Sequence, residues 1–197
     1  MSNKIRNAPV PLDSQGIDYL SPKEIAIILR GADEIVMQGG RALLAKVLKG
    51  SKEVTLQELN LDQIGPFGTL SDLSLKEIHA RIDWLILNDY LAIEYDHRLP
   101  LLVFTARGWE IEKQTLAVEC QTILDQIILD KVIASADSDY ELTWLNDGHR
   151  EVIICLLDLI RETGNREYIP LLESWSQSAV KKVRRMIKDV IEVLNKN

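Results

Sequence analysis

The chain has 197 residues and a formal net charge of −7; 46% of its residues are hydrophobic and 27% are charged. This composition is typical of a globular protein with a buried core in one or two domains. The sequence has neither a run of about 18 apolar residues nor the apolar core of a signal peptide near its start. We therefore expect a cytoplasmic protein with no membrane segment.

The negative total hides an uneven distribution of charge along the chain. Residues 21–116 hold 11 basic and 14 acidic side chains, residues 117–160 hold 2 and 9, and residues 161–197 hold 8 and 5. Phosphate binding depends on local basic surface rather than on the total. We therefore expect any nucleic-acid affinity to be modest and sensitive to salt.

Catalytic and metal-binding patterns are missing from the sequence. Cys120 and Cys155 lie far apart without a CxxC pair, which is typical of small buried apolar side chains in a reducing compartment. The three histidines, His79, His97 and His149, lack the spacing of metal ligands. We expect no cofactor, no metal and no enzymatic activity.

The first elements follow in a clear order. Residues 1–20, with two prolines, are expected to form an extended arm. Ser21, Pro22 and Glu24 then predict a helix start with a capping box, and the glycine pair 39–40 is expected to end that helix.

Three further helices are predicted before residue 90. The apolar spacing in Arg41–Lys49 favours a helix that Gly50 ends. A short helix is expected over Thr55–Asn60, with Thr55 and Glu58 as its capping box. Ser74 and Glu77 form another capping box, which starts a helix with Ile78, Ile82, Leu85 and Ile86 on its core face.

A β-hairpin is predicted next. Tyr90–Tyr95 alternates apolar and polar side chains, Asp96–Arg98 is a polar turn, and Leu101–Phe104 is rich in strand-forming residues. Thr105 can cap the following helix. A hairpin after several short helices is the order of a winged helix–turn–helix, which indicates binding rather than catalysis.

The rest of the chain is predicted to be helical. A long helix is expected from Arg107 to about Ala134, then a polar acidic connector, then helices over roughly 145–162, 166–175 and 178–195. We thus expect a mainly α fold with a small β-hairpin wing, in four parts. These are an arm (1–20), a winged-helix domain (21–112), a long helix with an acidic connector (113–144) and a helical extension (145–197).

The segment Arg41–Lys52 resembles the RQC (RecQ C-terminal) family, the winged-helix DNA-binding domain of RecQ-type helicases. Leu48–Ser51 corresponds to the family's Leu–Arg–Gly–Ser-like motif, Phe67–Gly68 to its aromatic–Gly loop, and Leu102–Gly108 to its closing motif. The resemblance covers about residues 21–112. It implies duplex, forked or end-containing DNA as the partner, in DNA repair, replication or recombination.

The sequence also departs from the helicases that carry this domain. It has no GxxxxGK[ST] loop for ATP, no four-cysteine zinc site, and no Gly–His pair before the aromatic loop. We therefore expect a free-standing RQC-like domain, with a helicase or another repair protein as a candidate partner. Residues 165–194 resemble a HEAT-like helical pair, which would make the extension a short helical stack.

The candidate DNA contacts are basic or small polar residues. Lys46, Lys49 and Lys52 recur every three residues near Gly50, where they favour either phosphate contact or a solvated helix end. The resemblance implies phosphate contact for Lys49, Gly50 and Ser51. The full set is Arg41, Lys46, Lys49, Gly50, Ser51, Lys52, Lys76, Arg81, His97, Arg98 and Arg107.

Two other basic regions have open interpretations. The helix after Ser74 corresponds to the recognition helix of an ordinary winged helix, but its cations are equally typical of a solvated surface. Near the C-terminus, a basic cluster indicates a second nucleic-acid or acidic-partner surface, or a solvated face. Its members are Lys181, Lys182, Arg184, Arg185 and Lys188.

The hypothesis is a DNA-binding protein that contacts phosphates through residues 46–52 and the polar hairpin tip. One alternative is a protein-interaction adaptor that uses the winged helix and the helical extension. The other is a transcriptional regulator that recognises a specific duplex sequence, which would require a dimer and a defined site.

Overall fold

The computed structural model describes residues 10–134 and 141–196, so the first part of the predicted arm and most of the acidic connector lie outside it. The chain divides into two compact units, residues 1–112 and 113–197, and the boundary falls inside the helix α5 (Ala106–Ala134). The described residues are mainly helical with a small antiparallel sheet. This confirms the predicted fold class, a winged helix followed by a helical extension.

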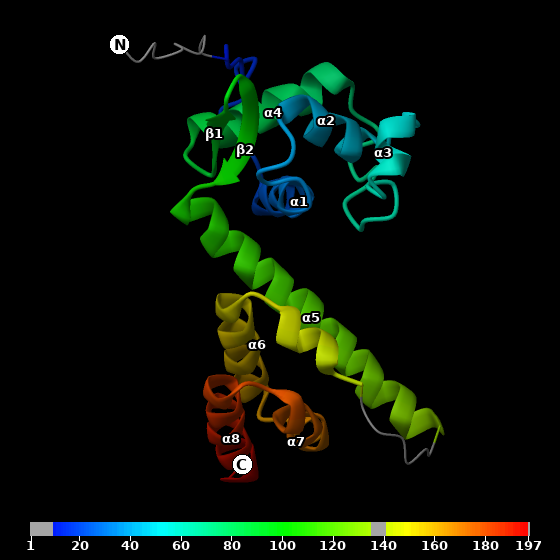
Figure 1. The fold of residues 1–197 in the computed structure, drawn as a ribbon, viewed down its shortest axis with the longest axis vertical. Coiled ribbons are helices and arrows are strands. Elements are labelled where there is room, and N and C mark those ends of the chain that lie inside the picture. Colours follow the sequence, from blue (N-terminus) through cyan, green and yellow to red (C-terminus); the bar gives the residue numbers. More distant parts are fainter. Residues whose placement is uncertain (1–9, 135–140, 197) are drawn as a thin grey trace. The chain divides into compact units, whose positions relative to one another are not determined.

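The first unit has four helices and a hairpin among its described residues. In chain order they are α1 (Pro22–Asp33), α2 (Arg41–Lys49), α3 (Val54–Glu58), α4 (Leu75–Leu87), β1 (Leu91–Asp96) and β2 (Leu99–Phe104). Figure 1 shows the hairpin beside α4, which its first strand contacts. The predicted wing is therefore present, with a register that pairs Leu91 with Phe104 and Asp96 with Leu99.

The loop before α2 extends this hairpin. The amide of Met37 donates to the carbonyl of Leu102 at 3.1 Å, and the amide of Leu102 donates to the carbonyl of Gly39 at 2.9 Å. At Gly40, an added Cβ would lie 2.6 Å from the carbonyl oxygen of Pro100. The chain therefore needs a small residue here, where it runs against β2 and turns into α2.

Apolar side chains from three helices and the hairpin form one core. Leu29 of α1, Leu44 and Leu48 of α2, and Ile82 and Leu85 of α4 have no measurable exposure. Their spacing of three or four residues places them on one face of each helix. Burying each of these side chains contributes about 1.5–3 kcal/mol.

Three helix predictions differ from the structure. The helix expected over 145–162 is divided into a 3-10 helix, Thr143–Asp147, and an α-helix, Arg150–Thr163. α1 ends at Asp33 instead of reaching Gly39–Gly40, because residues 34–38 turn to pair with β2. The predicted capping box of Thr55 and Glu58 is wrong. Glu53 is the extended residue that precedes α3, so Thr55 lies inside the helix, where it cannot cap the first amides.

Thr105 begins α5 as predicted. Its hydroxyl accepts the amide of Gly108 at 3.1 Å and donates to the carbonyl of Asp89 at 2.6 Å. A Cβ on Gly108 would lie 1.9 Å from the carbonyl oxygen of Tyr90, so the first turn of α5 fits only with glycine at this position. The end of the hairpin is thus fixed to the end of α4.

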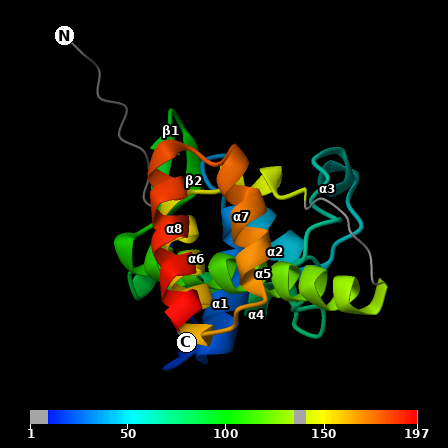
Figure 2. The same ribbon diagram turned by 90° about the horizontal axis from the view of Figure 1, so that it is seen from below.

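The second unit contains the remaining part of α5, a 3-10 helix and three further helices. They are η1 (Thr143–Asp147), α6 (Arg150–Thr163), α7 (Tyr168–Ser178) and α8 (Lys181–Lys196). α8 packs against both α6 and α7 (Figure 1, Figure 2). The two cysteines, in α5 and α6, are partly exposed instead of buried as predicted.

The capping residues provide a test of the fold. Ser21 accepts the amide of Glu24, whereas Thr55 makes no capping bond. We expect Ser21→Ala to lower the free energy of unfolding by about 1 kcal/mol. Thr55→Ala should change it by less than about 0.5 kcal/mol, as surface substitutions usually do. Urea unfolding followed by circular dichroism measures both, and equal losses would contradict this assignment of caps.

Candidate nucleic-acid interface

The C-terminal end of α2 is held by two glycines that face each other. Gly50 has a φ of 71°, and the amide of Ser51 donates back to the carbonyl of Lys46 at 3.0 Å. An added Cβ on Gly50 would lie 2.9 Å from the Cα of Gly68, whose amide donates to the carbonyl of Val47. The motif at 48–51 and the aromatic–Gly loop at 67–68 therefore pack directly together.

Lys49 is engaged within the protein. Its ammonium donates to the carbonyls of Ser71 at 2.5 Å and Leu73 at 2.9 Å, just before α4 begins. These bonds tie the end of α2 to the start of α4. In this conformation Lys49 has a structural role, and its predicted contact with phosphate remains a prediction.

The neighbouring lysines differ in their partners. Lys46 pairs with Glu53 at 2.6 Å, whereas Lys52 is exposed and no described carboxylate pairs with it. Ser51, between them, is half-buried. Lys52 is therefore the cation at this helix end that is available to a ligand.

Arg41 is bound to a buried carboxylate at the other end of α2. Its guanidinium pairs with Asp83, which is only 4% exposed and also accepts the amide of Asp13 at 2.8 Å. His79 lies nearby, and burial, followed by the Arg41 charge, lowers its pKa below the ordinary 6.5. The structure therefore places Arg41 in a bridge between α2, α4 and the arm.

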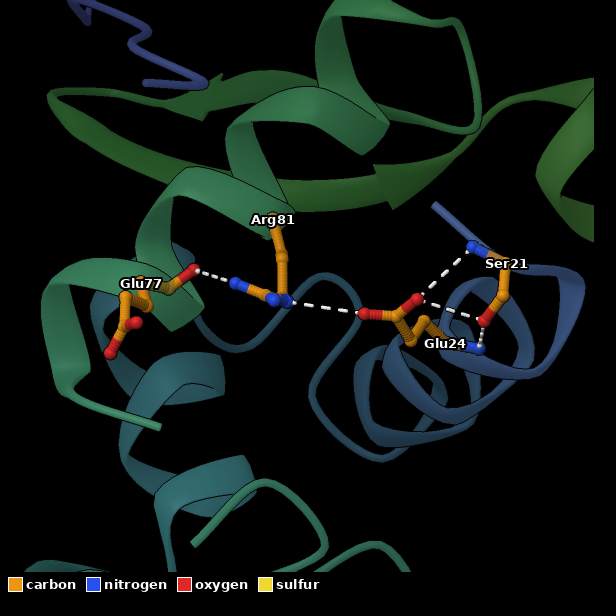
Figure 3. A network of polar contacts seen from close by, with 4 residues as sticks. All are labelled: Ser21, Glu24, Glu77 and Arg81. Atoms are coloured by element: carbon orange, nitrogen blue, oxygen red, sulfur yellow. Dashed lines mark hydrogen bonds and ion pairs between the residues drawn. The ribbon is translucent and has the colours of Figure 1, made fainter. Parts of the chain in front are cut away.

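Arg81 links α1 to α4 (Figure 3). It donates to the carboxylate of Glu24 at 3.3 Å and to the carbonyl of Glu77 at 3.2 Å, and Glu24 in turn accepts the amide and hydroxyl of Ser21. Because these two bonds hold its guanidinium between α1 and α4, Arg81 has a positioning role in this conformation.

The turn residues at the tip of the hairpin are all polar. His97 has a φ of 55°, is 92% exposed and contacts the carboxylate of Asp96 at 2.8 Å. Arg98 is exposed beside it, and Leu99, at 65% exposure, is the apolar side chain of the tip. The tip can therefore offer charge and hydrogen bonds to a backbone, with little apolar surface to insert between bases.

Arg107 is fixed at the base of the hairpin. Its guanidinium lies 4.0 Å from the centre of the Tyr90 ring and donates to the Tyr90 hydroxyl at 2.6 Å and the Asn88 carbonyl at 2.8 Å. Such a cation–π arrangement orients the charge. The ring of Trp84 is stacked with that of Tyr90, with 5.9 Å between the ring centres.

The eleven predicted residues therefore fall into three groups. Lys52, Lys76 and Arg98 are exposed and have no ion-pair partner within residues 10–134 and 141–196. Arg41, Lys46, Lys49, Arg81 and Arg107 make contacts within the protein, and Gly50, Ser51 and His97 shape the helix end and the turn.

Two positioning residues, Asp83 and Tyr90, were missed from the sequence. Asp83 stands between Ile82 and Trp84, and a carboxylate in an apolar run of a predicted helix is itself a sign of a buried charge pair. The sequence around Tyr90 has no comparable sign. Its role is to hold Arg107, which follows the hairpin in sequence and contacts Tyr90 only in the folded chain.

The short helices, the hairpin with its base fixed to α4, and the exposed cations at the hairpin tip and beside α2 and α4 define a winged-helix protein. A family model for the RQC domain matches residues 23–146, well over half of the chain. The chain belongs to the RQC domain family, whose members are the DNA-binding winged helices of RecQ helicases. Neither a curated protein nor a solved structure matches the chain.

In the part of the chain that the structure describes, no helix has the length and apolarity needed to cross a membrane. Within the same residues, no group of three or more histidine, cysteine, aspartate or glutamate side chains could hold a metal ion.

The contacts of Lys49 predict that substitutions of Lys49 and of the neighbouring Lys52 differ in their effect on stability. Lys49→Gln should lower the free energy of unfolding by roughly 1–2 kcal/mol, because two carbonyls lose a charged donor. Lys52→Gln, which removes the same charge from an exposed side chain, should change it by less than about 0.5 kcal/mol. Urea unfolding of both variants measures the difference, and an equal effect would contradict the positioning role of Lys49.

The Glu24 carboxylate predicts a dependence of stability on pH. Hydrogen bonds from the Ser21 side chain and backbone hold the pKa of Glu24 below its ordinary 4.5, with a further contribution from Arg81. The resulting stability is therefore present above pH 4.5 and is lost as the pH falls through the lower pKa of the folded state.

Glu24→Gln should make the unfolding midpoint fall less steeply on acidification below pH 4.5. The matched control is Glu58→Gln, which removes an exposed carboxylate of α3. Thermal unfolding at a series of pH values measures both, and identical pH profiles would argue against this contribution.

Proposed function

We propose that this protein binds duplex or forked DNA through phosphate contacts at two places in its first unit, residues 1–112, which we call the RQC unit. One lies where the end of α2 meets the start of α4, with Lys52 and Lys76, and the other is the hairpin tip, with Arg98. The match of the RQC family to residues 23–146 carries this proposal, and the exposed, unpaired cations support it. Lysine and arginine bind phosphates regardless of base sequence.

The architecture favours binding without catalysis of its own. The RQC domain is not catalytic, and the sequence contains no ATP-binding loop. We propose a role in DNA repair, replication or recombination, beside a helicase or another repair protein that supplies the motor. The polar tip at residues 97–98 suits contact with a backbone or groove better than separation of base pairs.

A protein-interaction adaptor is the second candidate, and one observation favours it. α3 exposes Val54 at 66%, and Leu59, which follows it, is 53% exposed. Exposed apolar side chains that form a patch are typical of protein-binding surfaces. Binding to a protein partner that persists at high salt, without affinity for DNA, would support this candidate.

The exposed cations provide the test. Lys52→Gln combined with Arg98→Gln should reduce the slope of log Kobs against log salt concentration by about 1.8 for duplex DNA, since each lost phosphate contact contributes about 0.9. Lys23→Gln combined with Arg30→Gln removes the same charge from α1 and should leave the slope unchanged.

Fluorescence anisotropy with duplex, forked and single-stranded oligonucleotides at several salt concentrations measures this slope. Tighter binding to forks or duplexes than to single strands is expected. Equal slopes for the two double variants would contradict the proposed interface, and no binding at low salt would contradict DNA binding itself.

A further inference from the structure

The first two turns of α8 carry a dense group of exposed cations. Four of the first five residues are Lys181, Lys182, Arg184 and Arg185, and Lys188 follows one turn later. Arg184 is held by the carbonyls of Ser176 and Ala179, both at 2.9 Å, at the end of α7. We call the remaining four side chains, Lys181, Lys182, Arg185 and Lys188, the α8 basic face.

The α8 basic face is not neutralised by the protein. All four side chains are exposed, and within residues 10–134 and 141–196 no carboxylate pairs with any of them. The opposite side of α8 buries Ile187, Val190 and Leu194. Because that apolar side fixes the rotation of the helix, the basic face must point into solvent.

The position of these cations is unfavourable for the helix itself. A helix N-terminus carries partial positive charge and prefers carboxylates, yet the first turn of α8 contains no acidic residue. The preceding residue, Val180, has no side-chain oxygen to cap the free amides, and its carbonyl accepts the amide of Arg184. The side-chain charges and the helix dipole therefore add, producing a positive potential that an anionic ligand would relieve.

A second helix start contributes to the same region. Arg150, the first residue of α6, and Lys182 both line a cavity of about 170 Å³, together with Val180 and Met186. Arg150 therefore adds one cation near Lys182, in a first turn of α6 that also contains Glu151.

The spacing of the α8 basic face fits an extended polyanion. Residues 181, 185 and 188 recur at i, i+4 and i+7 and span about 10 Å along the helix. Double-stranded DNA carries one negative charge per ~1.7 Å of axis, so several phosphates fall within this length.

We propose that the α8 basic face is a second contact for the backbone of the DNA that the RQC unit binds, an inference that rests on the proposed function. When one of two phosphate-binding surfaces on a chain has bound DNA, the local concentration of that DNA at the other surface is raised. The second unit then adds affinity and salt dependence without reading sequence.

The test uses the full chain and removes three charges of the α8 basic face. Lys181→Gln, Arg185→Gln and Lys188→Gln together should reduce the slope of log Kobs against log salt by about 2.7 and weaken duplex binding roughly tenfold or more. The control triple Arg161→Gln, Arg166→Gln and Lys196→Gln removes the same charge elsewhere in the second unit and should leave both unchanged. Because glutamine favours helix and the lost cations opposed the dipole, the melting temperature of the first triple should not fall.

The outcomes separate this inference from the proposed function. If the Lys52 and Arg98 double variant weakens binding while the α8 triple matches its control, the RQC interface stands and the α8 contact is overturned. The same holds if the α8 triple affects only binding to acidic peptides or anionic vesicles. If the wild-type chain shows no salt-dependent binding, both proposals fail.

Discussion

The RQC unit depends on one buried carboxylate. Asp83, on the core side of α4, pairs with Arg41 at the start of α2 and accepts an amide from the arm at Asp13. A buried charge is tolerated only when it is paired and hydrogen-bonded, and removing one partner of such a pair costs about 3–5 kcal/mol. This requirement fixes the start of α2 against α4 and holds the arm near both.

The other end of α2 is fixed by a different kind of contact. Lys49 donates to two carbonyls before α4, and Gly50 lies against Gly68. With both ends fixed, the position of α2 relative to α4 is determined by polar contacts as well as by the apolar core. The exposed cations Lys52 and Lys76 lie beside this rigid pair, which limits the entropy lost when a ligand orders them.

Much of the fold could be predicted because its signals are local. The capping boxes at Ser21 and Ser74 and the hairpin around residues 96–98 depend on side chains close together in sequence. The capping box at Thr55 was predicted wrongly because a Thr–x–x–Glu sequence inside a helix is the same as one at its start. The roles of Lys49 and Arg107 could not be predicted. The sequence around a lysine or arginine does not show whether its side chain turns inward or faces solvent.

The pairing of residues 37–39 with β2 determines which parts of the protein a force on the hairpin reaches. β2 is hydrogen-bonded along both edges near Leu102, to β1 on one side and to the loop before α2 on the other. Gly40 lies against Pro100, two residues nearer the tip than Leu102, so the middle of the hairpin is joined to the beginning of α2. A force applied to the hairpin is therefore transmitted to the beginning of α2 and, through the pair of Arg41 and Asp83, to the arm at Asp13.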